Sequence, residues 1–207
     1  MRWRFFVAIP ALWLAVLCVR AETLDRIAVT VGRHVISERD ILQDIRISAF
    51  IDGKAPIVTA EQKRKAAERL VDQYLVLEDA TATRVPPPPA SDVAALLTPI
   101  KARYATDQAY RAALAQAQIS EAELSEQLLA GLRMLRYTDL RFRPEAQVPE
   151  EAVRAYYDKV APPQSFEASR GDIEKLLTNQ QTMQALDRWL EMSRSETAIV
   201  YREGAFQ

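Results

Sequence analysis

The 207-residue chain has few of the residues that catalytic and metal sites need, with one cysteine, one histidine and five glycines. The cysteine, Cys18, lies in an apolar N-terminal run, so the rest of the chain has no thiol for a disulfide or a nucleophile. A lone histidine, His34, cannot by itself form a zinc site. Glycine-rich phosphate loops, Walker motifs and Gly-x-Ser-x-Gly are all missing. We therefore predict a protein that is not an enzyme and needs no cofactor or metal.

The chain also lacks a dominant charge. Its 27 basic and 28 acidic residues give a formal net charge of −1. This balance gives no support for binding to nucleic acid or to an anionic membrane surface. A basic cluster, Arg133, Arg136, Arg141 and Arg143, is interleaved with aromatic residues and could be an RNA-binding face. Without an excess of basic charge, we interpret it as a solvated helix end.

The first residues have the three-part layout of a secretory signal peptide. Arg2 and Arg4 precede an apolar run over residues 5–19, and Ala21 is a small residue at the expected cleavage point. We predict that residues 1–21 are removed and that the mature protein is located in the periplasm. Removal of three arginines would leave 24 basic and 28 acidic residues, a mildly acidic balance.

This segment could instead be a membrane anchor or a lipoprotein signal. A membrane anchor is disfavoured because the run is interrupted by Pro10 and is shorter than the ~20 residues that span a bilayer. A lipid-modified Cys18 is disfavoured because Leu17, not a small residue, precedes it. We therefore predict no stable membrane insertion after cleavage.

Short β-branched segments occur only near the two ends of the mature chain. Residues 27–36 read IAVTVGRHVI, two apolar runs around Gly32-Arg33, which is typical of a small hairpin. Residues 197–202 alternate in polarity and predict one more strand. Because a lone strand needs a partner, we expect both ends of the chain to meet in one sheet.

The rest of the chain predicts helices. Ser37 with Asp40, and Ser120 with Glu123, form capping boxes, and Thr59 is a third N-cap. The expected helices span residues 37–52, 59–84, 91–104, 106–118, 120–141, 150–159 and 166–194. The predicted fold class is therefore mainly α, a multi-helix domain with a small β-sheet formed by the N-terminal hairpin and the C-terminal strand.

Prolines and leucines add detail to this pattern. Pro86 to Pro89 end one helix and act as a rigid spacer, or alternatively as a ligand for a proline-binding module, and Pro99 predicts a kink. A stripe on the helix at residues 120–141 predicts core packing, and Gly131 beside it predicts close approach of another helix. The stripe comprises Leu124, Leu128, Leu132 and Leu135.

Several segments, in order along the chain, resemble SurA-type periplasmic chaperones. They are DRIAVTVGRHVISERDI at residues 25–41, LVDQYL at 70–75, VPEEAV at 148–153 with Tyr156-Tyr157, and the tail at 166–201. In that family, one or two parvulin domains of roughly a hundred residues separate the Tyr-Tyr helix from the C-terminal helix. Here only residues 160–165 fill that place, so the resemblance does not imply prolyl-isomerase activity.

The resemblance implies an N-terminal chaperone domain, residues 22–160, completed by the C-terminal helix and strand, residues 161–207. It implies an ATP-independent holdase that binds unfolded or outer-membrane polypeptides. Two alternatives remain: an isomerase-related protein with residual or lost activity, and an accessory subunit of one envelope complex. The sequence leaves open whether two copies pair as a homodimer.

A holdase needs an apolar groove that stays soluble when empty. The middle helices, away from the sheet, supply apolar side chains that could line such a groove or form ordinary core. The candidate client-binding residues are Leu96, Ile100, Tyr104, Tyr110, Leu114 and Met134.

Overall fold

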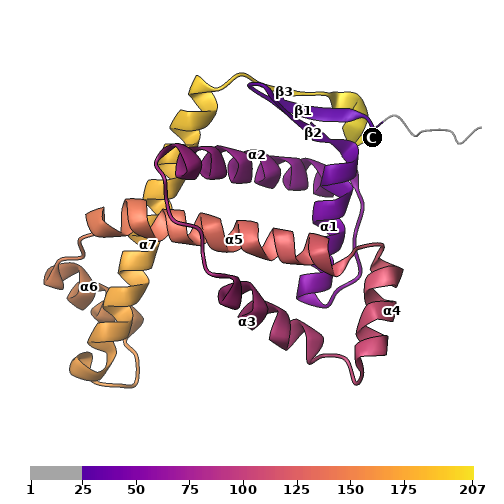
Figure 1. Ribbon diagram of the computed structural model, residues 1–207. Helices are drawn as coiled ribbons and strands as arrows, with labels where there is room; N and C mark the ends of the chain where they lie inside the picture. The colour runs from indigo at the N-terminus through magenta and orange to yellow at the C-terminus, as the bar shows by residue number, and fades with distance from the viewer. Residues whose placement is uncertain (1–24) are drawn as a thin grey trace, which may run out of the picture.

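The computed structural model describes residues 25–207, and the predicted signal peptide, residues 1–21, lies outside the described residues. Within the described range the chain forms seven α-helices and a three-stranded antiparallel sheet. The predicted fold class is confirmed (Figure 1). None of the helices in this range has both the length and the apolar character that crossing a bilayer requires.

The sheet joins the two ends of the described chain. Its strands are β1 (Ile27–Val31), β2 (His34–Ser37) and β3 (Ile199–Tyr201). β1 is central, because Val29 pairs with Ile36 on one side and with Tyr201 on the other. Gly32 has a φ of 57°, which an L side chain rarely adopts, and this is why glycine stands at the hairpin turn. The predicted pairing of hairpin and C-terminal strand is therefore confirmed.

Helix boundaries follow the local capping signals. Ser37 and Asp40 form a reciprocal capping box at the start of α1, and Ser120 and Glu123 form another at the start of α5. Gly53 ends α1 with a φ of 68°. The helices are α1 (Glu38–Asp52), α2 (Ala60–Ala82), α3 (Ala90–Lys101), α4 (Asp107–Ala117), α5 (Glu121–Phe142), α6 (Glu150–Val160) and α7 (Phe166–Glu196). Two 3-10 turns, η1 (Arg143–Glu145) and η2 (Glu203–Phe206), follow α5 and β3.

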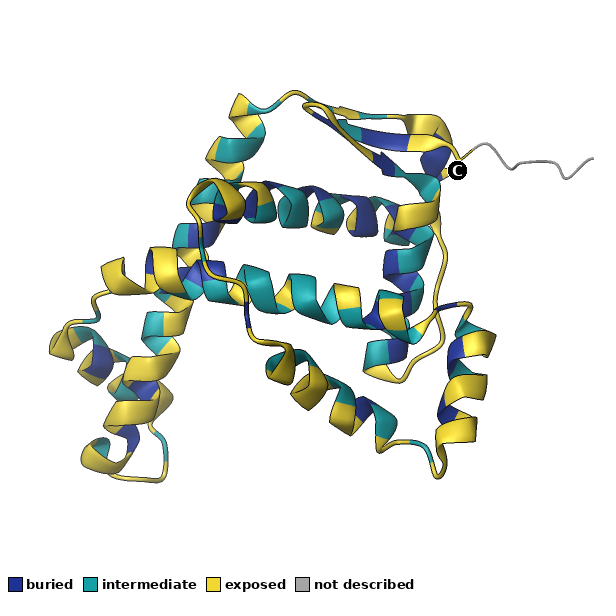
Figure 2. Cartoon of the chain, viewed as in Figure 1, coloured by how far each residue is buried: buried dark blue, intermediate teal, exposed yellow. Residues whose placement is uncertain are grey.

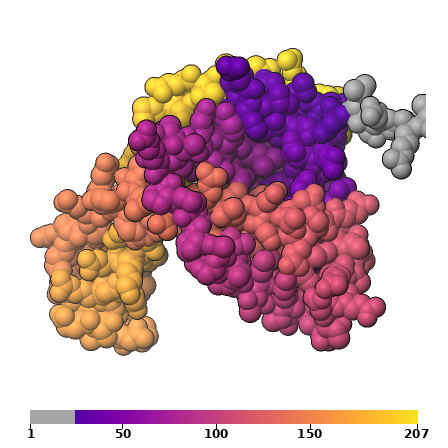
Figure 3. All heavy atoms as spheres, viewed as in Figure 1, coloured from indigo at the N-terminus to yellow at the C-terminus, as the bar shows by residue number. Residues whose placement is uncertain are grey.

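The long helices form a frame around the centre of the molecule. α2 and α5 pack side by side, α1 contacts both at one end, and α7 contacts both at the other (Figure 1). α3 and α4 lie beside α5, and α6 packs on the first half of α7 as a two-helix lobe. Figure 3 shows an open recess between this lobe and the α3–α4 lobe.

Three apolar clusters hold the frame together. The first joins the sheet to α1 and α2, the second joins α1 to α3, α4 and α5, and the third joins α2, α5 and α7. Figure 2 shows buried positions as dark blue bands on helices whose other residues are half-buried or exposed. Fully enclosed members, one or two from each cluster, include Val29, Val71, Leu124, Val76 and Tyr137.

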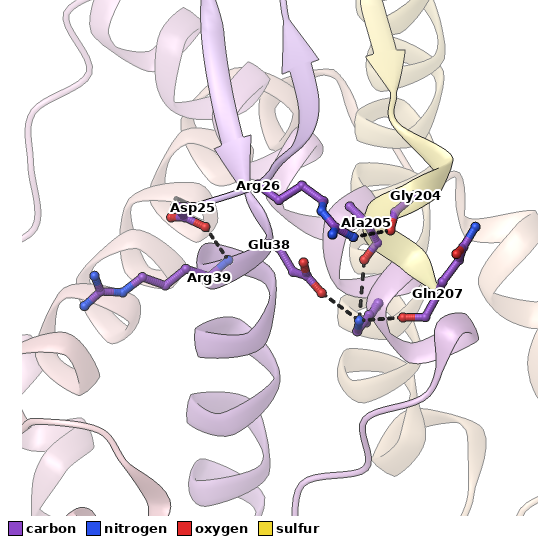
Figure 4. A network of polar contacts seen from close by, with 8 residues as sticks. Asp25, Arg26, Glu38, Arg39, Gly204, Ala205 and Gln207 are labelled. Carbon is purple, nitrogen blue, oxygen red and sulfur yellow. Dashed lines mark hydrogen bonds and ion pairs between the residues drawn. The ribbon is translucent and has the colours of Figure 1, made fainter. Parts of the chain in front are cut away.

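A buried lysine ties the C-terminal turn to the start of the fold. Lys63 Nζ donates to Glu38 Oε1 at 2.8 Å and to the main-chain oxygen of Gln207 at 3.0 Å (Figure 4). Arg26 Nη1 donates to the carbonyl oxygen of Gly204 at 2.7 Å. These bonds satisfy polar groups that closure of the sheet removes from water.

The leucine stripe of α5 is only partly core. Leu124 is fully buried, as predicted, but Leu135 is 59% exposed. Apart from the backbone of α5 itself and the two flanking residues, no described atom lies within 4 Å of the place that a Cβ on Gly131 would occupy. The predicted close approach of another helix at Gly131 is therefore wrong, and that side of α5 faces open space.

Candidate functional site

The predicted client-binding residues do not form one open groove. Ile100, Tyr110 and Leu114 are buried side chains of the cluster that joins α1 to α3, α4 and α5. Tyr104 packs against this cluster, with its ring centroid 5.7 Å from that of Tyr110. Tyr110 is only 1% exposed, and burial raises its pKa to about 12. In this conformation Ile100, Tyr110 and Leu114 are core residues, whereas Tyr104 is half-buried at the edge of the cluster.

Leu96 and Met134, the other two predicted client-binding residues, are not buried in that cluster. Leu96 on α3 is 39% exposed. Met134 on α5 packs against the third cluster, which contains Tyr137 and Leu186. The sequence pattern predicts all six residues on helices away from the sheet. In the structure they do not lie together on one exposed surface.

The structure has a different hollow, which we name the α1–α2–α5 groove. It is a solvent-open cavity of about 920 Å³ bounded by β2, α1, α2 and α5. This volume is within the roughly 300–1,000 Å³ typical of ligand-binding clefts. Its apolar surface is formed by Ile36, Ile47, Leu70, Tyr74, Leu77 and Ala130.

Side-chain amides add hydrogen-bonding groups to this apolar surface. Gln43 of α1, Gln73 of α2 and Gln127 of α5 line the groove from three sides. An amide both donates and accepts, so it can pair with the N–H and C=O groups of an extended peptide. The groove therefore offers apolar contact together with partners for a backbone that would otherwise lose water.

Aromatic stacking shapes the end of the groove next to the sheet. His34 of β2 lies flat on Tyr74 of α2, with ring centroids 4.2 Å apart and planes 6° apart. Burial raises the pKa of Tyr74, and the nearby Glu78 carboxylate raises it further through its negative charge. His34, the sole histidine of the chain, is exposed and is also part of the groove wall.

A buried carboxylate forms part of the groove wall. Asp44 is 4% exposed and accepts from Arg69 Nη2 at 2.5 Å and from Gln127 Nε2 at 3.2 Å. Burial raises the pKa of Asp44, and the Arg69 guanidinium opposes that shift. The interaction links α1, α2 and α5 on the three sides of the groove, so Asp44 has a clear structural role.

A second, smaller hollow of about 320 Å³ lies between the start of α3 and α5. Pro88 and the leucines Leu132, Leu135 and Leu140 supply its apolar lining. Leu135 and Leu140 are both more than half exposed. This surface is shallower and offers fewer polar groups than the α1–α2–α5 groove.

The sequence indicates the α1–α2–α5 groove only weakly. Leu70, Gln73, Tyr74 and Leu77 recur at helical spacing on α2 and mix apolar with amide side chains. Helical spacing places these apolar residues on the same face as Ala67 and Val71. In the structure Val71 is enclosed by the sheet cluster, whereas Leu77 borders the groove.

Comparison of the chain with protein-family models matches no family, and comparison with curated proteins finds no relative. Within residues 25–207, no three His, Cys, Asp or Glu side chains are grouped closely enough to hold a metal ion.

Proposed function

We propose that the protein is an ATP-independent holdase chaperone of SurA type that binds unfolded polypeptide in the periplasm. The observation that carries the proposal is the α1–α2–α5 groove, a cavity of about 920 Å³ that stays open although much of its lining is apolar. An exposed apolar concavity with a polar border is the surface expected at a polypeptide-binding site.

The groove is suited to an extended segment rather than to a compact ligand. Its walls come from three helices and a strand, so they are held by packing that does not depend on a client. Because the site is preformed, binding costs little ordering of the protein. Extended chains present alternate side chains and a row of backbone polar groups, which match the apolar and amide groups of the groove.

The family resemblance supports the same proposal from the sequence. The short connection at residues 161–165 joins α6 directly to α7, where the family carries its parvulin domains. The part of the family that the chain resembles is the part that holds clients. We accordingly propose binding without prolyl isomerisation.

Light scattering of aggregating clients tests the proposal. The full mature chain, added to three unrelated unfolding proteins, is expected to suppress aggregation of all three without ATP. Leu77→Gln should weaken protection several-fold, because it places an amide in the apolar groove wall. Leu176→Gln is the matched control, since Leu176 is exposed on α7 and does not line the groove.

Two results would reject the holdase proposal. One is failure of the wild-type chain to protect any client at a stoichiometric ratio. The other is protection that Leu77→Gln leaves unchanged, which would place client binding elsewhere on the surface.

A second function, an accessory subunit of one envelope complex, is favoured by the exposed leucines of the smaller hollow. Leu135 and Leu140 form an apolar patch that a single folded partner could cover. A dedicated subunit would leave unrelated clients unprotected. The same scattering experiment, with Leu135→Gln added, therefore separates the two functions.

A further inference from the structure

The α1–α2–α5 groove is strongly acidic although the whole chain is nearly neutral. Five carboxylates line it, and its only fully charged cation is Arg133. The chain as a whole has a formal net charge of only −1. The lining carboxylates are Asp40, Asp44, Glu78, Glu123 and Glu126. Negative charge is therefore concentrated at the groove.

Three of these carboxylates have structural partners. Asp40 and Glu123 accept from the backbone in the two capping boxes, and Asp44 pairs with Arg69. The remaining two, Glu78 and Glu126, take part in no ion pair within residues 25–207. They come from α2 and α5, the two long helices that form opposite walls. Two opposite walls thus carry carboxylates available to a ligand.

We propose that the groove selects extended polypeptide segments that carry lysine or arginine between apolar residues and discriminates against acidic segments. The inference rests on the proposed holdase function and adds the chemical class of the client. The half-buried apolar wall residues, such as Leu70 and Leu77, take the apolar side chains of the segment. Glu78 and Glu126 take its cationic groups.

Charge complementarity has a physical basis at this site. Walls of low dielectric reduce screening, so carboxylates beside a cavity attract a cation more strongly than carboxylates on a flat surface. A glutamate in the client would meet the like charges of Glu78 and Glu126 and would lose its water. Lysine and arginine also carry methylene stems that pack against the apolar walls.

Peptide binding tests this inference. Three fluorescently labelled nine-residue peptides share alternating leucine and serine, and differ only in two central residues, which are lysine, glutamine or glutamate. Fluorescence anisotropy with the full mature chain is expected to give about tenfold tighter binding of the lysine peptide than of the glutamate peptide at low salt. The difference should shrink several-fold at high salt, where exposed charges are screened.

A matched pair of double variants locates the selectivity. Glu78→Gln with Glu126→Gln should reduce the preference for lysine to about twofold and leave binding of the glutamine peptide unchanged. Glu174→Gln with Glu191→Gln makes the same charge change at exposed positions of α7 outside the groove and should leave the preference intact.

The outcomes separate the inference from the function. Equal binding of the lysine and glutamate peptides, or a preference that survives the groove double variant, overturns charge selection while the holdase proposal stands. Absence of binding to all three peptides overturns the inference and, together with failed protection from aggregation, the proposed function.

Discussion

Two apolar regions lie against α1, and only one of them is closed. Ile47 borders both, since it belongs to the cluster with Phe50 and Tyr110 and also lines the α1–α2–α5 groove. On the cluster side, α3 and α4 fold over the apolar surface. On the groove side, none of the elements described in residues 25–207 fills the hollow between α2 and α5. Similar residue types therefore form a closed core where other helices cover them and an open groove where none does.

The two regions also differ in their polar groups. The closed cluster is dominated by apolar and aromatic side chains, which gain most from complete removal from water. The groove mixes apolar residues with amides and carboxylates, which stay solvated while no ligand is bound. Mixed lining keeps an open apolar surface soluble, as a holdase requires.

The largest predicted effect is in the closed cluster. Tyr110→Ala should lower the free energy of unfolding by about 3 kcal/mol or more, because it empties a large, enclosed site. Urea unfolding measures the change. Tyr110→Phe keeps the ring and should cost less than about 1 kcal/mol. A Tyr110→Ala protein as stable as the wild type would mean that this region is open in solution, like the groove.

A smaller effect is expected at the buried ion pair in the groove wall. Arg69→Met should cost about 1–2 kcal/mol at neutral pH, because it leaves the Asp44 carboxylate buried without its cation. Burial raises the pKa of Asp44, so folding favours the protonated carboxyl. The stability that protonated Asp44 contributes is fully present below the usual pKa of 3.8. It is lost as pH rises through the pKa of the folded state. Arg69 offsets that loss, so the cost of Arg69→Met should nearly vanish at low pH.

Urea unfolding of wild type and Arg69→Met at neutral pH and below pH 3.8 checks this prediction. In an Asp44→Asn background, Arg69→Met should lose its pH dependence. A cost that is equal at both pH values would show that Arg69 stabilises the wall through packing alone.

The smallest effect on stability is expected on the open side. Leu77→Gln should change the free energy of unfolding by less than about 1 kcal/mol, because Leu77 is already partly solvated in the groove. Thermal unfolding monitored by circular dichroism measures it. A large loss of stability would mean that Leu77 belongs to the core, and the contrast between the two sides of α1 would fail.

Local signals in the sequence predicted most of the fold. Ser37 with Asp40, Ser120 with Glu123 and the Gly32 turn each set an element boundary through contacts within a few residues, so they could be found without knowing the tertiary structure. The shared sheet was also predicted, because a lone C-terminal strand has only one available partner.

The site could not be predicted in the same way. Whether Tyr110 is covered depends on how α3 and α4 fold back on α1 and α5, which is a long-range property. Periodicity places Leu135 and Leu124 on one stripe, but Leu124 is enclosed in the second cluster whereas Leu135 is more than half exposed. The acidic character of the groove arises from residues on three separate helices, which no sequence window brings together.

The pairing of β1 with β3 has a consequence for the folding of the newly synthesised chain. Val29 meets Tyr201, and Lys63 meets Gln207, so the sheet cannot close until the last residues of the chain are available. During synthesis, the N-terminal hairpin therefore stays without its third strand until residues 199–201 have been made. Completion of the sheet is a late step of folding, although β1 is the first element of the described chain to be made.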